Sequence, residues 1–409
     1  MRVLLISQYF PPETGATSNR MISIAKGLRR AGHEVHVIAE KPNHPEGVIR
    51  EGYRGGAFEE RRYEGIPVTY TWVYTRPEKD FLKRIAFYTS FMGMAVLAAM
   101  RKKGPFDVVF ASSPPLFVGI AGWIAARLND AQFVFDVRDT WPEVAVAMGA
   151  LNNPLAIGVA EVLERFIYNR ADAITAVTDS FCTHIDEIVD GSPPIRRIMN
   201  GTVPEVFNED DKRADKRADL GMSDKFVVLY AGNHGLAQGL PHIVKAAEVL
   251  EGKQNVEFVM VGSGPVKSDL IETAREHKVS QIRFIDRVSL EEAAEYMAAA
   301  DALLVPLEDH EIYKQFIPSK LFDSMAAGKP VLLSVDGEAR TILEDADAGL
   351  YYRAEHAEEL AERVTWLIQH PDEAEAMGKR GRIYAREHCT RASQVDKLTD
   401  FLEEIVASA

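Results

Sequence analysis

Short apolar runs alternate with longer segments of helical periodicity along most of this chain, and this alternation limits the fold more than any other feature. In the first half, the runs that predict strands span residues 3–6, 35–39, 68–72, 108–111, 133–136 and 173–177. Helical patterns separate several of them, at residues 21–31, 117–128 and 157–170. Strands that alternate with helices form right-handed βαβ units with a parallel sheet. The first half is therefore predicted to be an α/β domain.

A second series of the same kind follows a polar stretch. Residues 205–225 are rich in charges of both signs, which is typical of a surface crossing between domains. Predicted strands then resume at residues 226–231, 257–261, 283–285, 302–306 and 330–334. This restart predicts two similar Rossmann-like α/β domains that face each other across a cleft. Residues 394–406 have the pattern of one amphipathic helix.

Composition and charge argue against several classes of protein. The 409 residues carry a formal net charge of −14, which disfavours general nucleic-acid binding. Cys182 and Cys389 are far apart and neither lies in a CxxC pair, so no zinc site or disulfide framework is expected, and reduced thiols fit a cytoplasmic protein. The apolar run at residues 2–7 is too short for a signal peptide. The stretch 85–100 is too short for a spanning helix, which needs about 20 apolar residues. No metal-ligand motif occurs, so we expect no metal site.

Two glycine-containing loops follow predicted strands. The first contains Gly15 and Ala16 and leads into a helix, so its N–H groups favour an anionic ligand, although an ordinary strand-to-helix turn explains it equally well. The second contains Gly262 and Gly264 and resembles the start of a dinucleotide fingerprint, but Lys267 occupies the third glycine position. This second pattern therefore gives little support to a dehydrogenase.

The strongest functional signal is the segment 317–331. Pro318 suits the first turn of a helix and Gly328 suits its end. A helix start offers free N–H groups and a positive dipole end, to which Lys320 adds an ammonium, so the segment predicts a diphosphate site. Asp323 lies about one turn further on and would reach a ribose diol. The alternative is a capped surface helix with a solvated lysine. The residues expected to contact a nucleotide here are Pro318, Ser319, Lys320, Leu321 and Asp323.

A family resemblance rests on the segments 12–15, 200–203, 230–233, 261–264, 300–301 and 326–331 and on Gly239. In these segments the chain resembles glycosyltransferase family 4, a retaining and metal-independent family with the GT-B fold, over nearly its whole length. It looks most similar to the WbuB-like branch, which builds bacterial surface polysaccharides such as O-antigen. The resemblance implies an acceptor-binding domain at residues 1–205, joined by a C-terminal helix at 390–409. A nucleotide-sugar-binding domain is implied at residues 206–389.

The resemblance also implies the ligands. The donor would be a UDP-sugar, often of an N-acetylated aminosugar, and no cofactor would be needed. The acceptor would be a glycan or a polyprenyl-diphosphate-linked molecule.

The chain departs from the family pattern around the donor. Gln315 and Asp323 occupy the places of two usual glutamates, so Gln315 would hydrogen-bond the sugar without carrying charge. Gln238 replaces a usual phosphate-binding lysine, and Asn233 lies near the place of a missing arginine. Lys320 is therefore the main expected partner of the leaving diphosphate. The weaker cationic candidates are Arg287 and Arg340.

Polar residues after the predicted strand 133–136 are candidates for acceptor handling. Arg138 and Asp139 follow this strand at the expected ligand-binding edge of the sheet. They would orient the acceptor or polarise the transferring sugar, or they are instead a structural Asp–Arg pair that caps the next helix. His44 is a weaker catalytic candidate, because a lone loop histidine is more often solvated.

Residues 79–103 combine basic ends with an apolar, aromatic middle. This pattern suits a helix on an anionic membrane as well as one packed inside the first domain. The resemblance favours membrane contact, which would place the protein in the cytoplasm, peripheral to the inner membrane.

The mechanism implied is displacement at the sugar while the diphosphate leaves. The N–H groups of the Gly15 loop and of the helix start at Ser319–Lys320 would stabilise that diphosphate. Two other functions remain open on the sequence: a nucleotide-sugar 2-epimerase of similar fold, and a non-catalytic sugar-binding protein. A product assay separates the epimerase, because it converts donor without acceptor.

Overall fold

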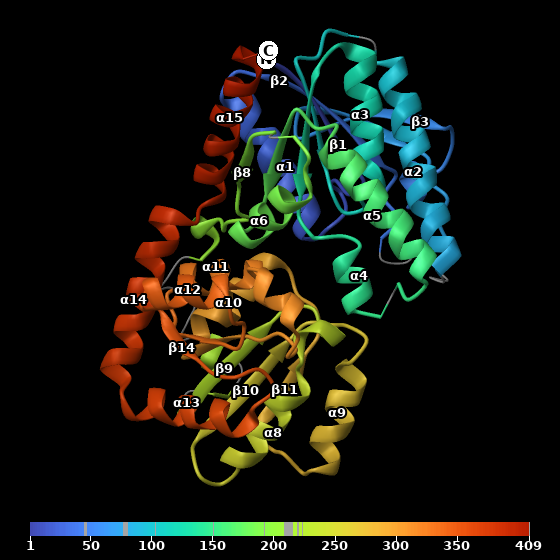
Figure 1. The fold of residues 1–409 in the computed structure, drawn as a ribbon. Coiled ribbons are helices and arrows are strands. Elements are labelled where there is room, and N and C mark those ends of the chain that lie inside the picture. Colours follow the sequence, from blue (N-terminus) through green and yellow to red (C-terminus); the bar gives the residue numbers. More distant parts are fainter. Residues whose placement is uncertain are drawn as a thin grey trace. The chain divides into compact units, whose positions relative to one another are not determined.

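The computed structural model describes residues 1–44, 47–76, 81–102, 104–149, 151–191, 193–207, 216–218, 221–222 and 224–408. The chain divides into two compact units (Figure 1). The first comprises residues 1–200 and 391–409, and the second comprises residues 201–390. The charged segments 208–215 and 219–220, which include Asp210 and Asp211, lie outside the described residues.

The first unit contains a sheet with the strand order β3-β4-β2-β1-β5-β6-β7-β8. Its strands are β1 (Arg2–Ser7), β2 (Glu34–Glu40), β3 (Phe58–Tyr63), β4 (Ile66–Thr71), β5 (Val108–Ser112), β6 (Gln132–Val137), β7 (Ala173–Ala176) and β8 (Ile195–Arg197). All neighbours pair in parallel except β3, which is antiparallel to β4. The expectation of a wholly parallel sheet is wrong at this edge, because the polar run 58–63 forms a hairpin through Gly65.

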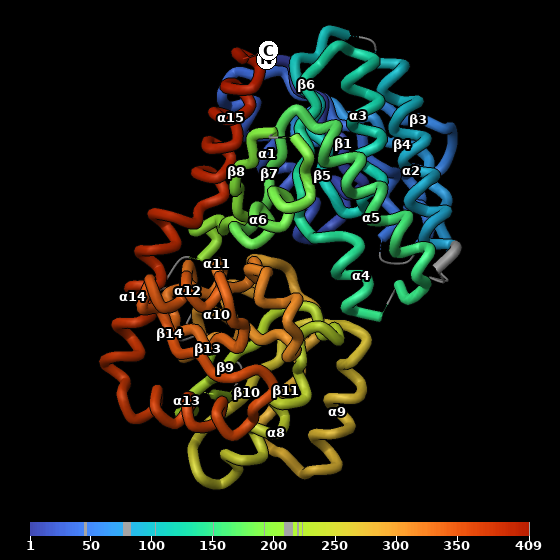
Figure 2. The backbone as a smooth tube through the Cα atoms, viewed as in Figure 1, coloured from blue at the N-terminus to red at the C-terminus, as the bar shows by residue number. Residues whose placement is uncertain are grey.

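Helices of the first unit are α1 (Ala16–Arg30), α2 (Phe81–Arg101), α3 (Phe117–Asn129), α4 (Glu143–Ala147), α5 (Pro154–Tyr168), α6 (Asp179–Ile188) and α15 (Arg391–Ala407), with a short η1 (Glu51–Tyr53). Helix α15 packs beside α1, as Figure 2 shows. A Cβ on Gly27 of α1 would lie 2.2 Å from Cγ1 of Val395, so the glycine allows this close approach. Leu398, Phe401 and Leu402 of α15 are buried in the core of the first unit. The last helix of the chain thus completes the first unit.

The second unit contains a parallel sheet with the order β11-β10-β9-β12-β13-β14. Its strands are β9 (Phe226–Ala231), β10 (Val256–Val261), β11 (Ile282–Ile285), β12 (Ala302–Val305), β13 (Val331–Leu333) and β14 (Gly349–Tyr351). Its helices are α8 (Pro241–Leu250), α9 (Lys267–Glu276), α10 (Leu290–Ala299), α11 (Ser319–Ala326), α12 (Glu338–Asp345), α13 (Ala357–Gln369) and α14 (Pro371–His388), with η2 (Pro204–Val206), η3 (Leu236–Gln238) and η4 (Glu311–Gln315). From β9 the chain adds β10 and β11 on one side of the sheet and then β12, β13 and β14 on the other. Ligands of α/β sheets bind at the point where the strand order reverses in this way, beside the loops at the carboxyl ends of the strands.

The chain passes between the units at Asn200 and Gly201, rather than at the expected residues 205 and 206. The N–H of Thr202 donates to the carbonyl of Cys389 at 2.8 Å, and Thr202 forms a bridge with Thr390. These contacts tie residues after 200 to the end of α14. Among the described residues, no helix is long and apolar enough to cross a bilayer.

Candidate active site

Lys320 and Tyr230 form the centre of the candidate site in the second unit. Helix α11 begins at Ser319, so Pro318 is its N-cap residue rather than part of its first turn. The Nζ of Lys320 donates a hydrogen bond to the Tyr230 hydroxyl at 2.9 Å. That hydroxyl in turn donates to the carbonyl of Asn233 at 2.6 Å, so it presents a lone pair to the ammonium. Leu321 is fully buried and anchors the helix start in the core.

Burial changes the ionisation of this lysine. It lowers the pKa of Lys320 to about 8, and the nearby Asp323 carboxylate opposes the shift. An ammonium has three N–H donors. Among the described residues, Tyr230 is its one hydrogen-bond partner, so donors remain for a ligand. A partly desolvated cation with free donors is a strong site for an anion.

Gly232 makes room for this lysine. Its φ is 152°, and a Cβ there would lie 2.1 Å from Cε of Lys320. A larger residue would therefore push the lysine side chain away. Sequence analysis missed Tyr230 and Gly232 as functional residues, although both lie in the family segment 230–233.

The loop after β10 packs against the loop after β9, backbone on backbone. A Cβ on Gly262 would lie 1.9 Å from the carbonyl oxygen of Gly232, and one on Gly264 would lie 2.3 Å from that of His234. The Nζ of Lys267 donates to the carbonyls of Gly262 at 2.9 Å and Ile285 at 2.8 Å. Lys267, which occupies the third glycine position of a dinucleotide fingerprint, therefore stabilises the loop after β10.

His234 is a buried group that sequence analysis did not select. The residue is 0% exposed, and neither ring nitrogen has a hydrogen-bond partner among the described residues. Burial lowers the pKa of His234 to about 4, and the positive charges of Lys267 and Lys320 act in the same direction. Its imidazole is therefore neutral near pH 7 and lies 5.6 Å from the Tyr230 ring.

Three residues predicted to bind the nucleotide-sugar donor differ in their contacts. Oδ1 of Asp323 accepts from the Thr202 hydroxyl at 2.7 Å. Oε1 of Gln238 accepts from the N–H of Gly235 at 3.1 Å and closes the turn before Gly239. Gln315 ends η4, and its Oε1 is buried with no hydrogen-bond partner among the described residues. Gln315 therefore has a polar atom that a bound ligand would satisfy.

The two alternative cations lie elsewhere on the second unit. Arg340 on α12 pairs with Glu344 at 2.7 Å and with Asp336 at 3.6 Å. Arg287 is exposed in the loop after β11. Neither has the burial of Lys320.

In the first unit, the predicted anion loop precedes α1. Gly15 is the N-cap residue of α1 with φ 152°, and no side chain caps this helix. Gly15 and Ala16 are both exposed. The helix start is thus accessible to a ligand.

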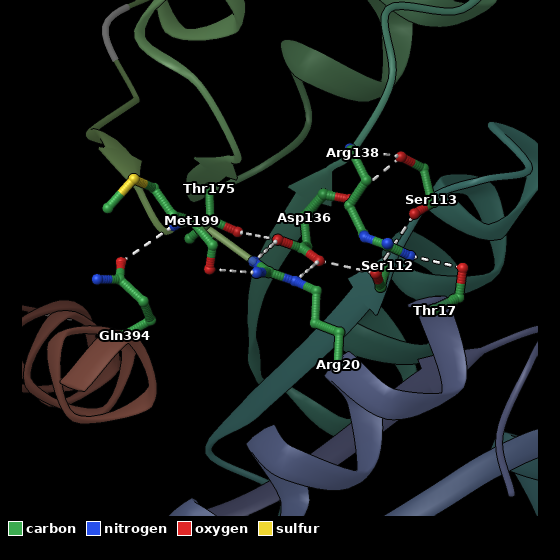
Figure 3. Close-up of polar contacts among 9 residues, drawn as sticks. All are labelled: Thr17, Arg20, Ser112, Ser113, Asp136, Arg138, Thr175, Met199 and Gln394. Atoms are coloured by element: carbon green, nitrogen blue, oxygen red, sulfur yellow. Dashed lines mark hydrogen bonds and ion pairs between the residues drawn. The ribbon is translucent and has the colours of Figure 1, made fainter. Parts of the chain in front are cut away.

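Asp136 and Arg20 form a buried ion pair close to this loop (Figure 3). Nη2 of Arg20 lies 2.9 Å from Oδ1 of Asp136, and the residues are 4% and 0% exposed. Ser112 and Thr175 donate to the same carboxylate at 2.7 and 2.8 Å. Burial by itself would raise the pKa of Asp136, but Arg20, Arg138 and the Ser112 hydroxyl together lower it. This satisfied pair is structural, and sequence analysis did not identify Arg20.

Arg138 and Asp139 follow Asp136 closely on the chain. Nη1 of Arg138 donates to the Thr17 hydroxyl at 2.6 Å, which joins the loop after β6 to the start of α1 (Figure 3). Burial lowers the pKa of Arg138 to about 10 and raises that of Asp139 to about 6. Oδ1 of Asp139 is buried without a hydrogen-bond partner among the described residues. Asp136 forms a structural ion pair with Arg20, but the expected alternative, an Asp–Arg pair that caps the next helix, is not found, because no described side chain caps α4.

His44 is placed by Glu13, a buried residue of the first glycine loop. Oε1 of Glu13 accepts from the N–H groups of Asn43 at 2.6 Å and His44 at 2.8 Å. The His44 side chain is exposed and lines a cavity of about 170 Å³. Other lining residues of this cavity are Tyr9, Arg76, Lys83, Arg84, Phe87 and Tyr88. Basic and aromatic groups therefore surround the histidine.

No group of three or more His, Cys, Asp or Glu residues in the described part of the chain is arranged to hold a metal ion.

The two units match two family models. Residues 15–201 match a model described as a glycosyl transferase 4-like domain. Residues 211–384 match a model described as glycosyl transferases group 1.

Curated relatives are similar over most of the chain. The colanic acid biosynthesis glycosyl transferase WcaI of Escherichia coli is 24% identical over 345 residues, which are 82% of this chain and 84% of its own. The glycosyltransferase WbjE of Pseudomonas aeruginosa is 26% identical over 64% of this chain and 66% of its own. A GDP-mannose-dependent alpha-mannosyltransferase of Mycobacterium tuberculosis is 25% identical over 94% of this chain and 93% of its own.

Solved structures share the fold over the full length. A sucrose-phosphate synthase from Thermosynechococcus elongatus has a TM-score of 0.78 at 19% identity, with 100% of both chains covered. Anabaena HepE in complex with UDP and glucose has a TM-score of 0.72 at 17% identity, with 99% of this chain and 100% of that chain covered. The expected arrangement of two Rossmann-like α/β domains is confirmed, and it is that of the GT-B class.

Proposed function

Because this chain belongs to the glycosyltransferases that join a glycosyl transferase 4-like domain to a group 1 domain, we propose that it is a retaining enzyme that uses a UDP-linked N-acetylated aminosugar. The observation that carries the assignment of a diphosphate donor is the ammonium of Lys320, which is partly buried in the first turn of α11. The UDP base and the N-acetylated sugar rest on the family resemblance. It combines a helix start with a fixed positive charge, and both favour a diphosphate.

The proposed reaction forms one glycosidic bond and breaks another. The acceptor hydroxyl oxygen attacks the anomeric carbon of the sugar while the bond from that carbon to the diphosphate oxygen breaks. A donor phosphate oxygen takes the hydroxyl proton, so no carboxylate base is needed. Attack on the same face from which the diphosphate leaves retains the configuration without a carboxylate nucleophile. Lys320 stabilises the charge that develops on the diphosphate. Gln315 would satisfy its buried amide oxygen on a sugar hydroxyl.

Arg138, Asp139 and His44 of the first unit are proposed to orient the acceptor. Asp139 retains a buried oxygen with no partner among the described residues. A carboxylate in that state readily accepts a hydrogen bond from a sugar hydroxyl.

We propose a polyprenyl-diphosphate-linked acceptor for the cavity beside His44. Arg76, Lys83 and Arg84 supply cations for a phosphate, and Phe87 and Tyr88 supply apolar surface. Helix α2, which contributes four of these side chains to the cavity, would then contact the inner membrane from the cytoplasm. The expected basic residues Lys79 and Lys103 lie outside the described residues.

A thermal-shift screen of UDP-, GDP- and ADP-sugars tests the donor, since a ligand of the folded state raises apparent stability. The proposal expects the largest shift with a UDP-linked N-acetylated aminosugar. Several relatives are named as GDP-mannose-dependent, so a GDP-sugar is the natural competitor. A larger shift with GDP-mannose, followed by product formation from it, would overturn the UDP assignment.

A further inference from the structure

A second basic cavity lies at the opposite edge of the first sheet from the Gly15 loop. It has a volume of about 610 Å³ and opens at the amino ends of β1 and β2. The turn between β3 and β4 and the end of α2 complete its rim. The candidate active-site loops of this unit follow the carboxyl ends of the strands, where ligands of α/β sheets bind. The cavity lies at the amino ends, so it is separate from that site.

The cavity is strongly cationic on an acidic protein. Its lining carries the cations Arg2, Arg29, Arg62, Arg101 and Lys102. Among the described lining residues, Glu34 is the one carboxylate, and it pairs with Arg2 at 3.0 Å. Lys102 also pairs with Glu60 at 2.8 Å. The cations still outnumber these two carboxylates, although the whole chain carries a net charge of −14.

Several guanidinium groups keep donors for a ligand. Arg29 makes no side-chain hydrogen bond or ion pair with any described residue, and a Cβ added to Gly65 would lie 3.2 Å from its Nη1. Arg62 donates to the Gly65 carbonyl at 2.9 Å through Nη1. A guanidinium has five N–H donors, so Arg29 and Arg62 retain most of theirs.

Helix ends explain only part of this charge. Arg29 and Arg101 lie in the last turns of α1 and α2, where cations complement the helix dipole. Arg2 and Arg62 belong to the strands β1 and β3, where no helix dipole favours them. A bound anion would explain why these two arginines also line the same cavity.

We infer that this cavity binds a molecule that carries at least two phosphate groups. Four of its five cations are arginines, whose planar forks match phosphate oxygens in a two-point geometry. The volume is ample for a diphosphate with an attached group. The phosphate groups belong either to a soluble molecule or to a lipid headgroup, and the two sources are separable by experiment.

Calorimetry with inorganic tripolyphosphate tests the site in the full-length protein. The test variant is Arg29→Gln with Arg62→Gln. The matched control is Arg30→Gln with Arg127→Gln, which removes two exposed charges outside the cavity. We expect the test variant to weaken binding at least about tenfold and the control less than about twofold. Circular dichroism melting verifies that both variants fold.

Two further measurements show whether the cavity binds independently of the donor site and whether its ligand is a lipid or a soluble molecule. Binding should persist in Lys320→Ala, because that residue belongs to the donor site. Sedimentation with vesicles of phosphatidylcholine that contain cardiolipin, whose headgroup carries two phosphates, reports a lipid source if wild type sediments and the test variant does not, and a soluble source if wild type stays unbound. The inference is overturned if wild type binds no tripolyphosphate, if the control loses as much affinity as the test variant, or if Lys320→Ala alone abolishes binding.

Discussion

Lys320 Nζ lies 2.9 Å from the hydroxyl of Tyr230, so the first turn of α11 is tied to the end of β9. The two residues are 90 positions apart in sequence. Tyr230 is completely buried, and its hydroxyl donates a hydrogen bond to the Asn233 carbonyl. A rigid hydroxyl thus holds a mobile lysine in one position, which is how an enzyme pre-organises a charge.

Lys320→Ala should lower kcat on the order of 10²-fold, by analogy with the loss of one oxyanion donor. It should also weaken binding of the nucleotide diphosphate, measured by calorimetry. The melting temperature should change little, because the lost packing is offset by relief of a buried charge. Lys253→Ala, at an exposed position, is the control. Near-normal turnover of Lys320→Ala at saturating donor would show that the lysine plays no part in catalysis.

The pH dependence of kcat/KM should show a falling limb near 8. Burial lowers the pKa of Lys320 to about 8, so the ammonium is present below that pH and is lost as the pH rises through it. Lys320→Arg keeps its charge and should move the limb upward, even if the rate is lower. An unchanged limb in Lys320→Arg would assign the titration to another group.

Gly232→Ala should lower kcat by displacing Lys320. The added Cβ would lie 2.1 Å from Cε of the lysine, in a backbone conformation with φ 152° that L-residues rarely adopt. Gly252→Ala is a matched control, because its φ is 69° and its Cβ would meet nothing within 4 Å. Equal losses of activity in the two variants would point to backbone strain alone.

Asp136→Asn and Asp139→Asn should have opposite effects on stability. Loss of the Asp136 charge leaves Arg20 buried and unpaired, which costs about 3–5 kcal/mol. Burial raises the pKa of Asp139 to about 6, so its ionised form is disfavoured in the folded state and the cost is present above that pH. Asp139→Asn should therefore raise the melting temperature at pH 7.5 and leave it nearly unchanged at pH 4. Thermal melts at both pH values measure this. Destabilisation by Asp139→Asn at pH 7.5 would contradict the assigned environment.

Activity should survive an excess of EDTA. No group of three or more His, Cys, Asp or Glu side chains among the described residues is arranged to hold a metal ion, and Lys320 is proposed to act on the diphosphate instead. The assay compares initial rates with and without chelator. Inactivation by EDTA with rescue by Mg²⁺ or Mn²⁺ would reveal a required metal.

Local patterns were sufficient to predict the two α/β series and the helix start at Ser319–Lys320. The period of apolar residues follows from the burial of strands and helix faces, and it needs no knowledge of distant contacts. Short edge strands were missed for the same reason. Strand β3 lies at an exposed edge of its sheet and is mostly polar, so it has no apolar run. Strand β14 has only three residues, which is too few for a recognisable pattern.

The sequence by itself determined which residues carry charge at strand ends, and only the tertiary structure decided which of them meet. Asp136 was visible beside Arg138, but its partner Arg20 is 116 residues away. Tyr230 and Lys320 likewise come together because β9 ends beside the start of α11. Such pairings depend on strand order and register, which long-range packing sets. The same packing takes Lys320 and Asp139 partly out of solvent, so it also decided the pKa values on which their proposed roles depend.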